Sequence, residues 1–149
     1  MARIRNLKPD LIADAEFIGL FNGEGHLDLA KASSGRSMVP RVRMAVRDDD
    51  VAVLQWCRAR FGGSITPTPK TRSACWQLTG REAVGVVVDL LLTSRITSKK
   101  TPEAALVKEA LALVPAPGRN ISDSSCARLL AIRDELKELR RYKEKEQAQ

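Results

Sequence analysis

The residue best placed to take part in chemistry is a glutamate at the end of a short apolar stretch. Glu24 follows the uncharged block 17–21 and lies between Gly23 and Gly25. Beyond it, polar and apolar residues alternate, which is typical of a strand, so Glu24 falls where a helix ends and a sheet begins. Two interpretations stay open. Glu24 is either a solvated carboxylate beside a helix-ending glycine, or a ligand for Mg²⁺, which takes one or two protein carboxylates and keeps waters.

Two glycines mark one face of the helix that we expect over residues 14–24. Gly19 and Gly23 lie four positions apart, so both fall on the same side of a helix. Residues without side chains leave a bare stripe against which a second helix can pack closely. This geometry is best known in membranes, but the apolar block here is far too short to span a bilayer.

The same stretch resembles a known sequence motif. Residues 17–25, Phe-Ile-Gly-Leu-Phe-Asn-Gly-Glu-Gly, resemble the nine-residue signature of the LAGLIDADG homing endonucleases. The resemblance implies that Glu24, at the second acidic position, binds the catalytic divalent metal, with Gly23 beside it in the metal site. Asn22 replaces the first acid of the motif and leaves the metal-binding position intact. The motif helix would pack on its twin from the other half through these residues: Phe17, Ile18, Gly19, Phe21, Asn22 and Gly23.

Length and charge bound the class of protein. The chain has 149 residues, which predicts one domain with a real core. Aromatic residues make up only 4% of it, so aliphatic side chains must fill that core. The net charge is +7 and the sequence pI is about 9.7. A basic domain favours a polyanionic partner, nucleic acid first and an anionic membrane second, with an inert basic surface as the alternative.

The few cysteines and histidines argue against a zinc site. Cys57, Cys75 and Cys126 are widely spaced, and His26 is the only histidine. This pattern fits neither a zinc site nor a disulfide framework and predicts free thiols in a reducing compartment. The basic N-terminus is followed by no long apolar run, so we expect no signal peptide or membrane span. The expected location is intracellular, either cytoplasmic or organellar.

Two hairpins supply the expected sheet. Strands are predicted at 25–32 and 38–47, and again at 64–70 and 73–79. In the second strand Arg41, Arg43 and Arg47 share one face, with aliphatic residues on the other. A solvated strand face usually mixes Thr, Lys and Glu. Three arginines with no acid among them therefore indicate an anionic partner.

Helices are expected to follow each hairpin. Asp48–Asp50 opens one, and Thr79–Glu82 resembles a capping box for the next. Thr101-Pro102-Glu103 is a strong helix start, and Ser122 or Asp123 caps a last helix whose polar end, from Arg140, is expected to fray. The order predicts an α+β fold, a four-stranded antiparallel sheet with one open face. It matches the αββαββα LAGLIDADG core over residues 14–114, so we assign 1–114 to the core domain and 115–149 to a linker and helix that complete the same domain.

The resemblance implies a function for this arrangement. One motif copy in a chain of this length is similar to the homodimeric branch of the family, in which two glutamates meet near the two-fold axis. The implied protein is a Mg²⁺-dependent endonuclease, encoded by a mobile intron or intein, that cuts double-stranded DNA at a long pseudo-palindromic site. Mn²⁺ or Ca²⁺ can replace Mg²⁺ in binding. The alternative is a cleavage-deficient relative that acts as an RNA splicing maturase or a DNA-binding regulator.

The expected DNA-binding residues follow from strand parity, since strands in the major groove read base edges. Arg41 and Arg43 are the expected guanine contacts. The full expected set is His26, Asp28, Ala30, Arg41, Arg43, Arg47, Ser64, Thr66, Thr68, Lys70, Ser73, Cys75 and Gln77.

Two further positions are expected near the cleavage site. The family keeps a basic residue before the helix that starts here at Thr101, which corresponds to Lys99 or Lys100, with Lys100 favoured. A polar residue at the end of the second strand corresponds to Arg47 or Asp48. A solvated loop at the lysines and a helix cap at Asp48 remain the alternatives. His26 is interpreted as a surface histidine, because a metal-assisted reaction of this family needs no such base.

Overall fold

The order of helices and strands is the predicted αββαββα, followed by two more helices. A computed structural model describes residues 12–148 except 34, 36, 95–99 and 117. The helices are α1 (Asp14–Glu24), α2 (Val51–Phe61), α3 (Arg81–Thr93), α4 (Thr101–Leu113) and α5 (Asp123–Gln147). The strands are β1 (Gly25–Lys31), β2 (Met38–Arg47), β3 (Ser64–Thr68) and β4 (Ser73–Leu78), with single 3₁₀ turns η1 (Asp48–Asp50) and η2 (Pro69–Thr71).

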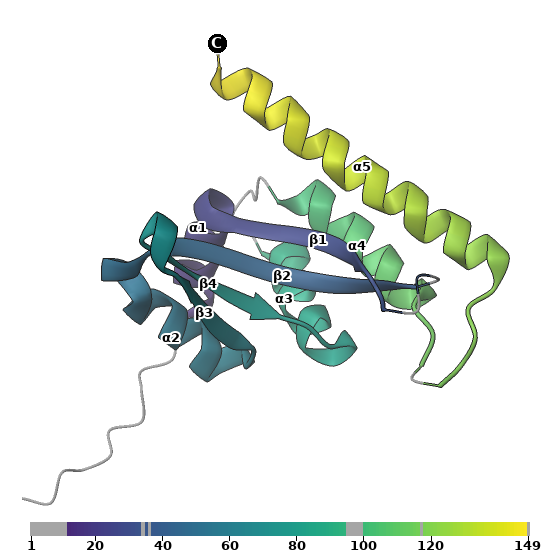
Figure 1. Cartoon of the computed structure of the whole chain (residues 1–149), viewed down its shortest axis with the longest axis horizontal. Helices are drawn as coiled ribbons and strands as arrows, with labels where there is room; N and C mark the ends of the chain where they lie inside the picture. Colours follow the sequence, from purple (N-terminus) through teal and green to yellow (C-terminus); the bar gives the residue numbers. More distant parts are fainter. Residues whose placement is uncertain (1–11, 34, 36, 95–99, 117, 149) are drawn as a thin grey trace, which may run out of the picture.

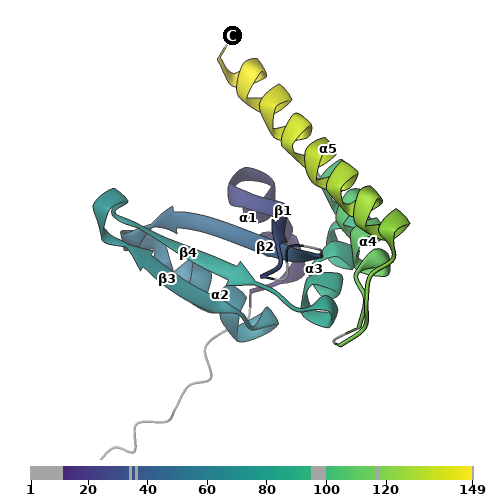
Figure 2. The same cartoon turned by 45° about the vertical axis from the view of Figure 1, so that its right-hand side comes forward.

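The four strands form one antiparallel sheet in the order β1-β2-β4-β3. Helices α1, α2 and α3 lie behind the sheet, α4 lies beside them on the β1 side, and α5 packs outside α4 (Figure 1). The opposite face of the sheet carries no helix in the part of the chain that the structure describes (Figure 2). Burial alternates along β1, β2 and β4, which confirms the predicted parity.

The core combines an aliphatic body with one aromatic cluster at α1. Trp76 is fully buried and donates its indole N–H to the Gly62 carbonyl over 2.8 Å. The ring of Phe17 lies 4.7 Å from that of Phe61 and meets Trp76 edge-on at 6.2 Å. These contacts join α1 to both α2 and β4, because each ring comes from a different element. Aromatic pairs of this kind each add about 0.5–1.5 kcal/mol beyond the area they bury.

Several local expectations differ from the structure. The capping box at Thr79 is wrong, since Gly80 precedes α3 at φ 100° and makes no side-chain cap. The strand predicted at 64–70 ends at Thr68, so Lys70 lies in the η2 turn. Helix α5 runs from Asp123 to Gln147, so it includes most of the polar end that is predicted to fray. The cap at Ser122 is confirmed, because its hydroxyl accepts the Ser125 N–H at 3.2 Å.

The remaining composition-based expectations concern cysteines and membranes. The structure shows Cys57, Cys75 and Cys126 as free thiols. Burial raises the pKa of the Cys57 thiol to about 11, which keeps it protonated. Among residues that the structure describes, no helix combines the length and apolar character needed to cross a bilayer.

Candidate active site and open sheet face

Glu24 is the last residue of α1, and the chain enters β1 at the next residue with no loop between them. Gly25 makes this possible, because it is buried and any side chain there would run into the ring of Phe21. Phe21 is itself fully buried. The carboxylate of Glu24 is exposed and makes no hydrogen bond or ion pair with any described residue. The helix–strand junction therefore presents a rigidly placed, uncommitted carboxylate.

The carboxylate opens onto a surface cleft of about 440 Å³. Arg47 at the end of β2, Asp50 and Ser73 line this cleft together with Glu24. The Arg47 side chain is 84% exposed and pairs with Asp49 at 3.3 Å. Asp48 is exposed, and its backbone N–H donates to the Arg72 carbonyl at 2.9 Å, tying the end of β2 to the β3–β4 turn. The structure thus brings Glu24 and Arg47 to one cleft, where an acidic and a basic group face the same space.

Lys100 immediately precedes α4 and does not line the cleft at Glu24. It is only 7% exposed, and its ammonium is 4.0 Å from the carboxylate of Glu103, which is 2% exposed. The pKa of His26 is lowered, chiefly by burial and next by the charges of Lys100, Arg140 and Arg43, against an opposing effect of Glu103. Lys100 is therefore close enough to act electrostatically on a residue two positions past Glu24. Lys99 lies outside the described residues.

The open face of the sheet carries the polar residues that strand parity assigns to it. The pairing register aligns His26, Arg43, Gln77 and Ser64 in one row across all four strands. Such a row offers a cation, an amide and a hydroxyl at neighbouring positions. The following residues lie on this face: His26, Asp28, Ala30, Arg41, Arg43, Ala45, Arg47, Ser64, Thr66, Thr68, Ser73, Cys75 and Gln77. Lys70 is exposed at the η2 turn, beyond the end of β3.

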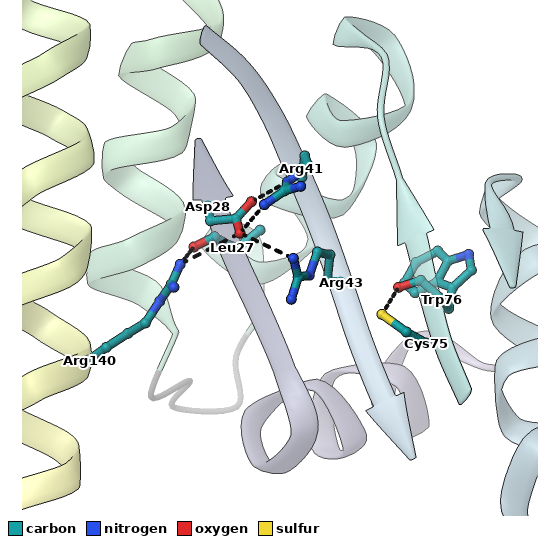
Figure 3. Close-up of polar contacts among 7 residues, drawn as sticks. All are labelled: Leu27, Asp28, Arg41, Arg43, Cys75, Trp76 and Arg140. Carbon is teal, nitrogen blue, oxygen red and sulfur yellow. Dashed lines mark hydrogen bonds and ion pairs between the residues drawn. The ribbon is translucent and has the colours of Figure 1, made fainter. Parts of the chain in front are cut away.

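A group of three arginines surrounds Asp28 on this face (Figure 3). Arg41 donates Nε–H and Nη2–H to the two carboxylate oxygens over 2.7 and 2.8 Å. This bidentate bond is the main reason the pKa of Arg41 is raised. Arg43 approaches the same carboxylate only to 3.9 Å, and its buried Nε has no partner among described residues. Asp28 therefore holds Arg41 firmly and Arg43 loosely.

Arg140 of α5 completes this group, and its place here was not predicted from the sequence. Its Nη2 donates to the Leu27 carbonyl at 3.0 Å and lies 4.0 Å from the Asp28 carboxylate. Leu27 and Asp28 are both more than a hundred positions from Arg140 in sequence. Only the helical spacing from buried Leu136 to Arg140 could have indicated that this side chain points back toward the sheet.

The residues of α1 predicted to meet a partner helix fall into a buried group and an exposed group. Phe17, Ile18 and Phe21 are 0%, 4% and 0% exposed, because they fill the core of their own chain. Their assignment to a dimer interface stays a prediction, and in this chain they make core contacts. Gly19 and Gly23 are exposed, and a methyl group on either would meet nothing within 4 Å. The bare stripe predicted from their spacing is open.

The comparisons with known proteins define the class of fold. No protein-family model and no curated protein matches the chain. Among solved structures, the homing endonuclease I-TnaI is similar with a TM-score of 0.72 and 18% identity, over 91% of this chain and 99% of that one. The LAGLIDADG homing endonuclease I-GzeII, in complex with a DNA target, is similar with a TM-score of 0.71 and 13% identity. The match covers 89% of this chain and 46% of that one.

A third structure extends this comparison. The homing endonuclease I-CvuI, in complex with its target in the presence of 2 mM Ca, gives a TM-score of 0.70 and 13% identity over 85% of this chain and 80% of that one. The chain thus spans nearly all of I-TnaI but less than half of I-GzeII. These likenesses show that the chain has the LAGLIDADG homing endonuclease fold, as the sequence predicts.

Proposed function

We propose that the chain belongs to the LAGLIDADG homing endonucleases and cuts both strands of DNA at a long, pseudo-palindromic site as a Mg²⁺-dependent homodimer. The observation that carries this proposal is the carboxylate of Glu24, which has no partner among the described residues and is fixed at the tip of α1 beside an open, cationic sheet face. The resemblance of the fold to endonucleases solved with their DNA targets supports it.

The donor set of the site fits a hard cation that keeps most of its waters. Among the described residues, no group of three or more His, Cys, Asp or Glu side chains could hold a metal ion. One carboxylate such as Glu24, beside the backbone at Gly23, suits Mg²⁺, which binds through one or two carboxylates plus substrate phosphates. When bound, Mg²⁺ supplies charge neutralisation at the phosphate and acidifies a water. I-CvuI complexes solved in the presence of Ca and of Mg are consistent with such a cation.

The chain's own residues have separate tasks in this proposal. Glu24 holds the cation. Arg47, in the same cleft, binds the scissile phosphate and offsets its charge as it grows. Lys100 contributes positive potential beside the helix–strand junction, and its partner Glu103 fixes its position. The Asp48 backbone bond to Arg72 orients the strand end that carries Arg47.

The base-reading residues follow from the contacts on the open face. Arg41 has two of its donors engaged by Asp28, so it is a poor candidate for a bidentate guanine contact. Arg43 keeps more of its donors available and lies in the row with Gln77. We assign Arg43 to guanine and Gln77 to adenine, the pairings that these side chains favour in the major groove. The hydroxyls of the β3–β4 hairpin supply adaptable contacts nearby.

A homodimer would pair the α1 stripes of two chains. Gly19, Asn22 and Gly23 form the surface that a twin helix meets, and the two Glu24 carboxylates then lie near one axis, one for each DNA strand.

Gly19→Lys should leave the chain folded, because no described atom lies within 4 Å of the added Cβ, and should abolish the dimer. Gly85→Lys on α3 is the matched control, since its Cβ position is equally open. Analytical ultracentrifugation distinguishes the two, and a dimer that survives Gly19→Lys would place the interface elsewhere.

Cleavage itself is tested with a plasmid that carries the uninterrupted insertion site of the protein's own gene. We expect linear product with Mg²⁺ and none with EDTA. A gel shift without cutting would support the DNA-binding regulator, and splicing of a precursor RNA without DNA cutting would support the maturase. Absence of both DNA binding and cutting would contradict the proposal.

A further inference from the structure

A basic cleft lies between α5 and the edge of the sheet, apart from the residues assigned above to cleavage and base reading. It has a volume of about 280 Å³ and is lined by Lys31 and Asp28 of β1, Arg41 of β2, and Arg133, Lys137 and Arg140 of α5. Five of these side chains are cationic and one is anionic. The cleft therefore carries a strong local excess of positive charge in the part of the chain that is described.

The sequence of α5 explains how three cations reach this place. Leu129, Ile132 and Leu136 are buried and set one side of α5 against the core. Arg133, Lys137 and Arg140 follow each other at helical spacing on the neighbouring side, which faces β1. These three cations therefore line the same cleft beside the edge of the sheet.

The contacts within the cleft show which charges remain available. Asp28 already accepts a bidentate bond from Arg41, and Arg140 is held by the Leu27 carbonyl. Lys31, Arg133 and Lys137 make no hydrogen bond or ion pair with any described residue. A protein gains nothing in stability by gathering like charges without partners. Their arrangement fits an external anion.

We infer that the α5–β1 cleft binds backbone phosphodiesters of the DNA that lies on the open sheet face, with Arg133 and Lys137 as the contacting residues. This inference rests on the proposed function. The cleft shares Asp28 and Arg41 with the open face, so a duplex on that face extends to it. Phosphate contacts of this kind fix the register of the protein on DNA and carry no base preference.

The test is Arg133→Ala/Lys137→Ala, with Arg81→Ala/Lys108→Ala as the matched control that removes two cations from α3 and α4. Both variants should unfold at the temperature of the wild type by circular dichroism. Affinity is measured by fluorescence anisotropy between about 50 and 200 mM salt, for a target duplex and an arbitrary duplex. We expect the first variant to bind both duplexes about tenfold more weakly than the wild type. The plot of log K against log salt should become less steep by about 2, because two phosphate contacts are lost.

The outcomes separate this inference from the proposed function. If the first variant binds like the control, the α5–β1 cleft contacts no phosphate and the inference fails while DNA binding stands. A loss confined to the target duplex would assign the two residues to base reading and overturn it as well. If the wild type binds neither duplex, the proposed function fails, and this inference with it.

Discussion

Two carboxylates four residues apart in sequence have opposite surroundings. Glu24 ends α1, is exposed, and has no described partner. Asp28 lies in the middle of β1, and its side chain is 14% exposed. It accepts two hydrogen bonds from Arg41, and two further guanidinium groups lie within 4.0 Å of it. The same functional group thus has its charge neutralised in one place and available in the other.

The difference teaches which acid can act on a ligand. A carboxylate that already accepts a bidentate arginine has its charge paired, so a metal ion would have to compete with the guanidinium for both oxygens. The Asp28 group is a positioning device that sets the arginines of the sheet face. The Glu24 carboxylate is pre-placed by a buried glycine and an aromatic ring and is left open. Each of the following experiments exchanges or removes one side of this contrast.

The largest effect is expected from Glu24→Gln. The amide keeps the size of the side chain but loses the charge that a cation requires. Loss of a residue that only supports a metal ligand lowers activity by up to roughly 100-fold. Loss of the ligand itself should lower the cleavage rate further, while the DNA affinity stays near that of the wild type. Plasmid linearisation and gel shift measure the two quantities. Glu16→Gln, an exposed acid in the first turn of α1, is the control. Cutting by Glu24→Gln at the wild-type rate would remove the glutamate from the metal site.

Gly25→Ala is expected to disturb the position of Glu24 without changing its charge. The added methyl group would overlap the buried ring of Phe21. Overpacking of this kind costs about 1–3 kcal/mol of unfolding free energy, and cutting should fall through misplacement of the carboxylate. Gly85→Ala on α3 is the control, because a methyl group there meets nothing within 4 Å. Urea unfolding gives the free energy, and equal stability of the two variants would show that the junction is not tightly packed.

The strands and the open face could be predicted from the sequence because their signal is local. Alternation of polar and apolar residues placed β2 at 38–47, where the structure has it, and put Arg43 and Gln77 on the same face. The predicted capping box before α3 was wrong, because Gly80 precedes the helix in a backbone conformation that a capping box does not use. Local patterns therefore predicted most strand bounds and the start of α4 at Thr101, but neither the end of β3 nor the start of α3.

What could not be predicted depends on distant partners. The apolar residues of the motif were assigned to a partner helix, yet Phe17 packs on Phe61 and Trp76 within the chain. The motif alone does not say which apolar residues the chain needs for its own core. In the same way, the bond from Arg41 to Asp28 requires the register of two strands, and the contact of Arg140 with Leu27 requires the path of α5.

Asp28→Asn should release the arginines that the carboxylate now holds. An amide neither attracts a guanidinium by charge nor accepts both of its donors, so Arg41 becomes available to phosphates. We expect the affinity for an arbitrary duplex to rise several-fold. The difference in binding free energy between the target and the arbitrary duplex should decrease by about 1–3 kcal/mol, which is what one good base contact contributes. Asp89→Asn, whose partner Lys108 lies away from the sheet face, is the control. Unchanged preference for the target in anisotropy titrations would show that Asp28 does not position Arg43.

The smallest effect is expected at His26, which lies between the two carboxylates in sequence. If the charge of Glu24 or Asp28 dominated there, the pKa of His26 would be raised. It is instead lowered from 6.5 by burial and by Lys100, Arg140 and Arg43, with only Glu103 opposing. Below its pKa of about 6.5 the unfolded chain binds a proton that the folded chain resists, so folding stability declines as the pH falls. His26→Gln removes this contribution, and its melting temperature should fall less than that of the wild type between about pH 7 and 5. A melting temperature that falls equally with pH in the two proteins would mean that burial and the nearby cations do not lower the pKa of this histidine.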